Sequence, residues 1–321
     1  MSTEGGTKAV LAALLANTGI ALTKFLAWAL TQSSSMLAEA IHSVADSGNQ
    51  LLLLLGGRKA RKHADAEHPF GYGRERYVYG FIVAVVLFSV GGLFALYEAY
   101  HKWHEVQQDP GDLGQLDGRW WWVPLVVLGV AIVMEGFSLR TAVREANHAR
   151  GEATLVQFVR RAKAPELPVI LLEDFAAITG LSFALLGVGL TLVTRNPVFD
   201  VLGTALIGLL LVVVAVVLAL ETKSLLLGEA ASPEAQRTIR RALEETDGID
   251  GVIHMKTLHL GPDELLVAVK IAVTASDTAA EVADAIDRAE AAVRAAEPTA
   301  RAIYLEPDLR RPALGSDTGV A

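Results

Sequence analysis

Residues 35–56 read SMLAEAIHSVADSGNQLLLLLG, an apolar stretch interrupted by polar side chains at helical spacing. An α-helix turns about 100° per residue, so these polar side chains fall on one face. They are Ser35, Glu39, His42, Asp46, Asn49 and Gln50. Ionisable groups at membrane depth cost about 2.5–3.5 kcal/mol each, so they are rare and usually functional. The stretch therefore predicts a membrane helix with one functional polar face.

His42 and Asp46 are the pair on this face best placed to share an ion. They lie four residues apart, which puts their side chains one helical turn apart. An imidazole and a carboxylate suit a borderline divalent metal such as zinc. The alternative is a polar contact between helices, with Asp46 hydrogen-bonded to a neighbour. The spacing favours metal ligands over such a contact.

The composition is that of a membrane protein. Hydrophobic residues make up 52% of the 321 residues, which is too many for an ordinary soluble domain. The formal net charge of -8 argues against a nucleic-acid partner. The chain has no cysteine, so disulfides and thiolate metal sites are excluded. No cofactor is predicted, and a metal must be held by His, Asp, Glu, backbone groups or water.

Six apolar runs approach or exceed the roughly 20 residues needed to cross the hydrocarbon core. They are residues 8–31, 35–57, 77–100, 120–144, 168–194 and 197–227. Basic residues concentrate after the second and the fourth run, so the positive-inside rule puts both termini in the cytoplasm. The sequence thus predicts a multi-pass protein of the lipid bilayer, in the cell's inner or plasma membrane.

After Gly228 the sequence changes to that of a small soluble domain. A helix from Ser232, strands at 252–260 and 265–273, a helix from the Thr278 capping box and a strand at 300–305 follow in order. We expect a transmembrane domain, a cytosolic α-β-β-α-β domain and a disordered tail. Their residue ranges are 1–228, 229–308 and 309–321. Because such a soluble domain is small for independent stability, packing against a second copy is plausible and predicts a homodimer.

One helix cannot surround an ion, since zinc takes about four donors. The fifth run supplies adjacent acids, Glu173 and Asp174, whose side chains point about 100° apart. One is expected to bind while the other pairs with a basic group or joins a proton path; the alternative is a solvated pair at the membrane edge. Glu135 in the fourth run is a candidate ligand, proton acceptor or partner of Arg140. Asn17 in the first run is a further candidate donor.

Five other positions are weaker candidates. Glu39 shares the polar face and is a candidate for the metal or proton path. Asp65 and His68, in the loop after the second run, either capture metal at the cytoplasmic mouth or form a solvated turn. His254 and His259 lie five residues apart on one strand, so they point to opposite faces and are expected to be structural.

Three stretches together resemble the cation diffusion facilitator family, whose members are six-helix metal transporters with a cytosolic ferredoxin-like domain. They are residues 38–46 (AEAIHSVAD), 68–74 (HPFGYGR) and 303–307 (IYLEP). The resemblance covers residues 8–308 and implies an α-helical membrane protein followed by a small α+β domain. It also implies that His42 and Asp46 bind the metal. Where the family's fifth helix usually has His-x-x-x-Asp, this chain has Asp174 and Ile178, as in a divergent branch that lacks the motif.

The resemblance implies three clear donors, His42, Asp46 and Asp174. Glu173, water or a residue of the first or fourth helix would complete the set. Two further departures, Tyr72 in the loop and Tyr304 in the last strand, stand where the family has histidine and imply weakened accessory metal sites.

The implied function is that of a secondary transporter, not an enzyme. Its substrate would be Zn²⁺, or Mn²⁺, Fe²⁺ or Co²⁺, exported in exchange for protons. Metal binding requires deprotonated ligands, so proton entry expels the metal. A non-transporting membrane scaffold and a proton-coupled carrier of a small organic solute remain alternatives.

Overall fold

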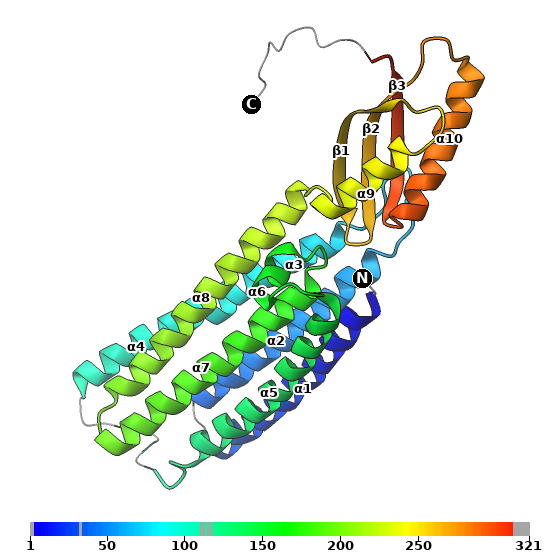
Figure 1. The fold of residues 1–321 in the computed structure, drawn as a ribbon. Helices are drawn as coiled ribbons and strands as arrows, with labels where there is room; N and C mark the ends of the chain where they lie inside the picture. Colours follow the sequence, from blue (N-terminus) through cyan, green and yellow to red (C-terminus); the bar gives the residue numbers. More distant parts are fainter. Residues whose placement is uncertain (1–2, 32–33, 110–112, 114–115, 117, 311–321) are drawn as a thin grey trace. The chain divides into compact units, whose positions relative to one another are not determined.

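The computed structural model describes residues 3–31, 34–109, 113, 116 and 118–310. The side chains of some residues in the first two helices, Glu39 and His42 among them, lie outside the described residues. So does nearly all of the tail predicted to be disordered. The described residues form two compact units (Figure 1). The first is drawn from Met1–Lys62 and Glu75–Leu226, and the second from His63–Arg74 and Leu227–Ala321.

The first unit consists of helices. They are α1 (Thr3–Thr31), α2 (Ser34–Lys59), α3 (Glu75–Val86), the π-helical η1 (Leu87–Leu93), α4 (Phe94–Gln108), α5 (Val123–Ala149), α6 (Leu155–Arg161), α7 (Glu166–Thr194) and α8 (Val198–Leu227). Because α3, η1 and α4 follow one another without a break, the described residues contain six long helical segments, at the positions of the six predicted runs. The short α6 and the π-helical turn were not predicted.

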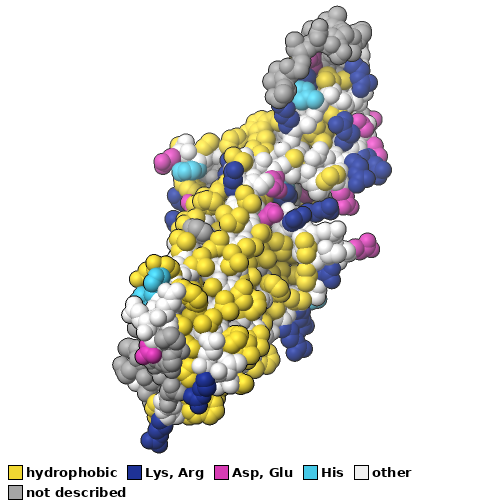
Figure 2. Space-filling model, turned by 90° about the vertical axis from the view of Figure 1, so that its left-hand side faces the viewer, with side chains coloured by type: hydrophobic (Ala, Val, Ile, Leu, Met, Phe, Trp, Pro, Cys, Tyr) yellow, Lys and Arg dark blue, Asp and Glu magenta, His cyan; other side chains and the backbone are white. Residues whose placement is uncertain are grey.

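Four of these segments, among the residues that the structure describes, are long and apolar enough to cross a membrane. They are Glu75–Gln108, Val123–Ala149, Glu166–Thr194 and Val198–Leu227. Figure 2 shows hydrophobic side chains covering a broad exposed surface, as expected for a face in contact with lipid tails. The helical unit therefore has the exposed apolar surface that the predicted multi-pass architecture requires.

Helix contacts place α1, α2, α5 and α7 around a common interior. α1 contacts α2, α5 and α7, and α5 also contacts α7. The third segment packs on α8 through glycines: a Cβ added to Gly92 would lie 2.8 Å from Val212, and one added to Gly208 would lie 2.8 Å from Leu96. Such close approach of backbones is typical of membrane helices, where small residues replace hydrophobic burial as the packing device.

The second unit is a small α+β domain with the predicted element order. It contains α9 (Pro233–Glu244), β1 (Gly251–Gly261), β2 (Glu264–Ala272), α10 (Ala279–Ala296) and β3 (Ala300–Asp308). The sheet order is β1-β2-β3, with β1 antiparallel and β3 parallel to β2. Alternate residues of β2, such as Val267 and Ile271, are fully buried in a core shared with α9 and α10. The predicted strand alternation is confirmed.

Residues 63–74, which connect α2 to α3, belong to this second unit. They approach the turn between β1 and β2 closely: a Cβ added to Gly261 would lie 2.8 Å from the Cα of Gly73. Neither position has room for a side chain. Gly71 in the same segment has a φ of 78°, a left-handed conformation that favours glycine.

Candidate metal centre

Buried polar side chains gather on the helices that surround the interior of the first unit. They come from α1, α2, α5 and α7, and no more than 8% of any of these residues is exposed. We call the group the polar centre. Its described members are Asn17, Lys24, Asp46, Asn49, Gln50, Glu135, Glu173 and Asp174. Because burying so many ionisable groups in an apolar bundle is costly, their presence indicates function.

Two amides of α2 hold the carboxyl group of Glu173 on α7. Asn49 Nδ2 donates to Glu173 Oε1 at 2.9 Å, and Gln50 Nε2 donates to Glu173 Oε2 at 3.0 Å. Gln50 Oε1 in turn accepts from Asn17 Nδ2 of α1 at 3.2 Å. We call the hold of Asn49 and Gln50 on Glu173 the amide clamp. Since both carboxyl oxygens are engaged, the clamp competes with any role of Glu173 as a metal ligand.

Asp174, the next residue of α7, has different surroundings. It is 1% exposed and lies beside Ser138 of α5. Among the described residues, its Oδ2 has no hydrogen-bond partner, and neither does Oε2 of Glu135. The amide oxygens of Asn17 and Asn49 are unpaired in the same way. Buried acceptor oxygens without donors are rare in proteins and mark positions for water or a cation.

The polar centre contains more carboxyl groups than basic groups among the described residues. The charges of Asp46, Glu135, Glu173 and Asp174 act on one another, and that of Lys24 acts on Glu135. If all four carboxyl groups were ionised, they would carry three more negative charges than the single ammonium group of Lys24 balances among these side chains. Lys24 Nζ also donates to Ser43 Oγ at 2.8 Å. Such an excess inside an apolar bundle needs cations, either protons or a metal ion.

The described side chains do not themselves form a complete metal shell. Within the described part of the chain, no group of three or more His, Asp or Glu residues has the geometry of a metal site. His42 and Glu39 lie in α2, but their side chains are outside the described residues. The ligand set of His42, Asp46 and Asp174 therefore stays a prediction.

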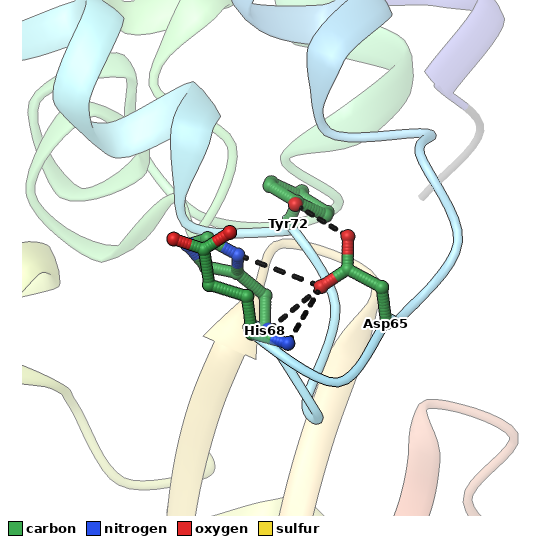
Figure 3. Close-up of polar contacts among 4 residues, drawn as sticks. Asp65, His68 and Tyr72 are labelled. Atoms are coloured by element: carbon green, nitrogen blue, oxygen red, sulfur yellow. Dashed lines mark hydrogen bonds and ion pairs between the residues drawn. The ribbon is translucent and has the colours of Figure 1, made fainter.

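The loop candidates Asp65 and His68 form a hydrogen-bonded turn (Figure 3). Asp65 Oδ1 accepts the backbone N–H groups of Glu67 at 3.1 Å and His68 at 2.8 Å, and Oδ2 accepts the Tyr72 hydroxyl at 2.7 Å. His68 Nδ1 lies 3.6 Å from Oδ1, and both side chains are exposed. The geometry supports the solvated turn, because hydrogen-bond donors already occupy the Asp65 carboxylate.

In the soluble domain, Lys270 lies between two side chains of the sheet that could each donate to a metal. His254 and Glu306 are its neighbours on either side, in β1 and β3. Lys270 Nζ lies 3.0 Å from Glu306 Oε1 and 3.1 Å from Asp308 Oδ2, and these carboxylates raise the pKa of Lys270. The three side chains line a depression of about 180 Å³. An ammonium group, not a converging donor set, therefore lies between His254 and Glu306, while His259 is buried.

The sequence pattern did not reveal the ion pair between Arg76 of α3 and Glu166 of α7. Arg76 Nη2 donates to Glu166 Oε2 at 2.8 Å, and the Arg76 Nε also donates to this carboxylate. The two side chains are only 11% and 9% exposed. The amide clamp was missed as well, although Asn49, Gln50 and Glu173 each stood out as polar residues in apolar runs.

Comparison with known proteins gives one family match and several relatives. The model of the cation efflux transmembrane domain matches residues 10–227. The mitochondrial proton-coupled zinc antiporter SLC30A9 of Mus musculus is 34% identical over 261 residues, which is 80% of this chain and 44% of the antiporter. Metal tolerance protein C4 of Arabidopsis thaliana is 30% identical over 258 residues, 79% of this chain and 54% of that protein.

The chain thus spans about half the length of these curated relatives, 44% and 54% respectively. Among solved structures, a MamM-CTD variant covers 25% of this chain and 94% of its own, with 24% identity and a TM-score of 0.23.

Proposed function

Because this chain belongs to the cation diffusion facilitator family, we propose that it is a secondary transporter that exchanges a divalent metal cation for protons. Zn²⁺ is the substrate that best suits the donors in the polar centre, with Mn²⁺, Fe²⁺ and Co²⁺ as competitors. The observation that carries this proposal is the excess of carboxyl groups over basic groups buried between α1, α2, α5 and α7 among the described residues. Zinc antiport and metal tolerance, which are stated in the names of two relatives, are consistent with this proposal.

In this proposal the metal binds to His42 and Asp46 of α2 and to Asp174 of α7. The unpaired Oδ2 of Asp174 supports its assignment, because a buried carboxylate oxygen without a donor is ready to accept a cation. Glu135, whose Oε2 is also unpaired, or a water molecule would supply a fourth donor. Glu173 is assigned to positioning, because the amide clamp occupies both of its oxygens.

Charge balance supplies the coupling between metal and protons. Three surplus negative charges in an apolar bundle can be offset by a dication or by protons, but the carboxylates cannot hold both on the same lone pairs. Protons that reach Asp46 and Asp174 from one side therefore release the metal. The metal, when it arrives from the other side, releases the protons. A proton gradient would thus drive metal export without a nucleotide.

Zinc flux into proteoliposomes tests the proposal directly. With an encapsulated zinc indicator, an imposed pH gradient should drive uptake, and a protonophore should abolish it. Asp174→Asn should lower the initial rate at least tenfold, whereas Glu152→Gln, at an exposed position between α5 and α6, should retain most of the flux. Absence of gradient-driven flux for all four metals, with correctly folded protein in the bilayer, would overturn the proposal in favour of a scaffold or an organic-solute carrier.

We further propose a homodimer in the inner or plasma membrane, with both termini in the cytoplasm. Neither α9 nor α10 covers one face of the sheet, and Tyr304 on that face is 58% exposed. The basic residues that flank the second and fourth runs support the orientation. Because the chain has no cysteine, Ser276→Cys gives a unique label for the soluble domain. An impermeant thiol reagent applied from outside intact cells should not reach it.

A further inference from the structure

The short helix α6 is fixed against the end of α5. A reciprocal capping box starts it: Thr154 Oγ1 accepts the Gln157 N–H at 3.2 Å, and Gln157 Oε1 accepts the Thr154 N–H at 3.0 Å. Phe158, on the inner side, is 5% exposed and shares a core cluster with Ala142 and Ala146 of α5. The helix is therefore an ordered element whose position along α5 is known.

The exposed stripe of α5 shows at what depth α6 lies. The stripe consists of residues at alternating spacings of four and three: Val126 (51% exposed), Val130 (44%), Val133 (58%) and Phe137 (63%). The same spacing continues into Arg140 and Arg144, which are also exposed. A lipid-facing stripe that changes from valine and phenylalanine to arginine passes from hydrocarbon to headgroups. Because α6 follows the basic end of α5 and contacts α5, it lies at headgroup depth.

The outer face of α6 combines apolar and basic side chains. Val156 is 68% exposed and Leu155 is 36% exposed. Arg160, four residues after Val156, shares its face and is exposed, as is Arg161. The sequence of α6 contains no acidic residue. An apolar side chain beside arginines suits a bilayer interface. The apolar side chain enters the edge of the acyl-chain region, and the arginines reach the phosphate oxygens of the headgroups.

We propose that this outer face, formed by Leu155, Val156, Arg160 and Arg161, is a docking surface for anionic phospholipids. Charge complementarity and depth both point to lipid: the face is basic, and it lies where the α5 stripe meets the headgroups. α6 leads directly into α7, so bound lipid also restrains the beginning of the helix that carries Asp174. The surface is separate from the polar centre and does not depend on the substrate assigned there.

A single spin label tests whether the face enters the bilayer. Val156→Cys provides the only thiol in the full chain, and Ser276→Cys in the soluble domain is the matched control. In vesicles of equal parts phosphatidylcholine and phosphatidylglycerol, the label at position 156 should collide preferentially with oxygen. The control label should collide preferentially with a water-soluble nickel chelate. Equal nickel accessibility at the two positions would overturn the proposal.

The preference for anionic headgroups has its own test. Each basic residue at an anionic surface contributes about fivefold to binding, so Arg160→Gln/Arg161→Gln should reduce phosphatidylglycerol retained in native mass spectrometry about 30-fold. The matched pair Arg237→Gln/Arg240→Gln, exposed on α9, should retain it. Inorganic phosphate should not displace the lipid. Equal retention in both double variants, or displacement by phosphate, would refute a lipid-binding face.

Discussion

Replacing Gln50 with leucine should destabilise the helical unit, because Gln50 is fully buried and joins three helices. Its Nε2 donates to Glu173 at 3.0 Å, and its Oε1 accepts from Asn17 at 3.2 Å. Leucine has a similar volume but leaves Glu173 Oε2 and Asn17 Nδ2 without these partners. Each buried polar group left unpaired costs about 1–3 kcal/mol, so the free energy of unfolding should fall by about 2–6 kcal/mol.

A double-variant cycle isolates the contribution of the Gln50–Glu173 contact. Gln50→Leu and Glu173→Leu each remove this contact, so their combination should cost less than the sum of the two, with a coupling in the range of about 0.5–3 kcal/mol. Equilibrium unfolding in mixed micelles, followed by circular dichroism, measures all three variants. Gln107→Leu, exposed near the end of α4, is the matched control. The amide clamp would be refuted if the losses of unfolding free energy were additive, or if Gln50→Leu cost no more than Gln107→Leu.

Three further predictions concern ion pairs and helix caps. Arg76→Gln should lower the free energy of unfolding by about 3–5 kcal/mol, since it leaves Glu166 buried without that partner, and Arg76→Gln/Glu166→Gln should recover most of it. Equal losses of unfolding free energy in the single and the double variant, measured by equilibrium unfolding, would contradict this prediction. Thr278→Ala should cost about 1 kcal/mol and speed amide hydrogen exchange in the first turn of α10 while leaving α9 unchanged. The Thr278 backbone and side chain lower the pKa of Glu281 from 4.5. Ionised Glu281 therefore stabilises the folded state fully above the pKa that this group has in the unfolded chain. The contribution is lost as pH falls through the lower pKa that Glu281 has in the folded state. The protection factors of α10, which are corrected for the intrinsic exchange rate at each pH, should fall in acid, and Glu281→Gln should flatten that profile.

The helices and the small sheet were predictable because their signals are local. A run of about 20 apolar residues has few uses other than crossing lipid, and each long helical segment lies where such a run does. Thr278 and Glu281 identified the start of α10 because a capping box involves only four residues. Alternation in β2 identified the buried side of the sheet in the same way.

Contacts between distant residues were not predictable. Gln50 and Glu173 are 123 residues apart, and Arg76 and Glu166 are 90 apart. Nothing near either partner indicates the other, because such pairs depend on how whole helices rotate and pack. The orientation of α6 has the same origin: seven residues are too few for a clear periodic pattern, and only the burial of Phe158 shows which side faces the bundle.

Glu173 and Asp174 show what tertiary contacts add to a sequence pattern. The pattern predicts two adjacent acids that point apart, but it cannot assign their roles, since their chemistry is the same. The amide clamp separates them: it engages both oxygens of Glu173 and leaves Oδ2 of Asp174 unpaired among the described residues.

The clamp holds Glu173 of α7 against α2, and hence restrains the direction of the adjacent Asp174, which lies beside Ser138 of α5. Gln50→Leu should therefore weaken zinc binding although Gln50 is not an assigned ligand. Loss of only stability, with zinc affinity unchanged in equilibrium dialysis of the folded variant, would show that Asp174 is positioned by other contacts.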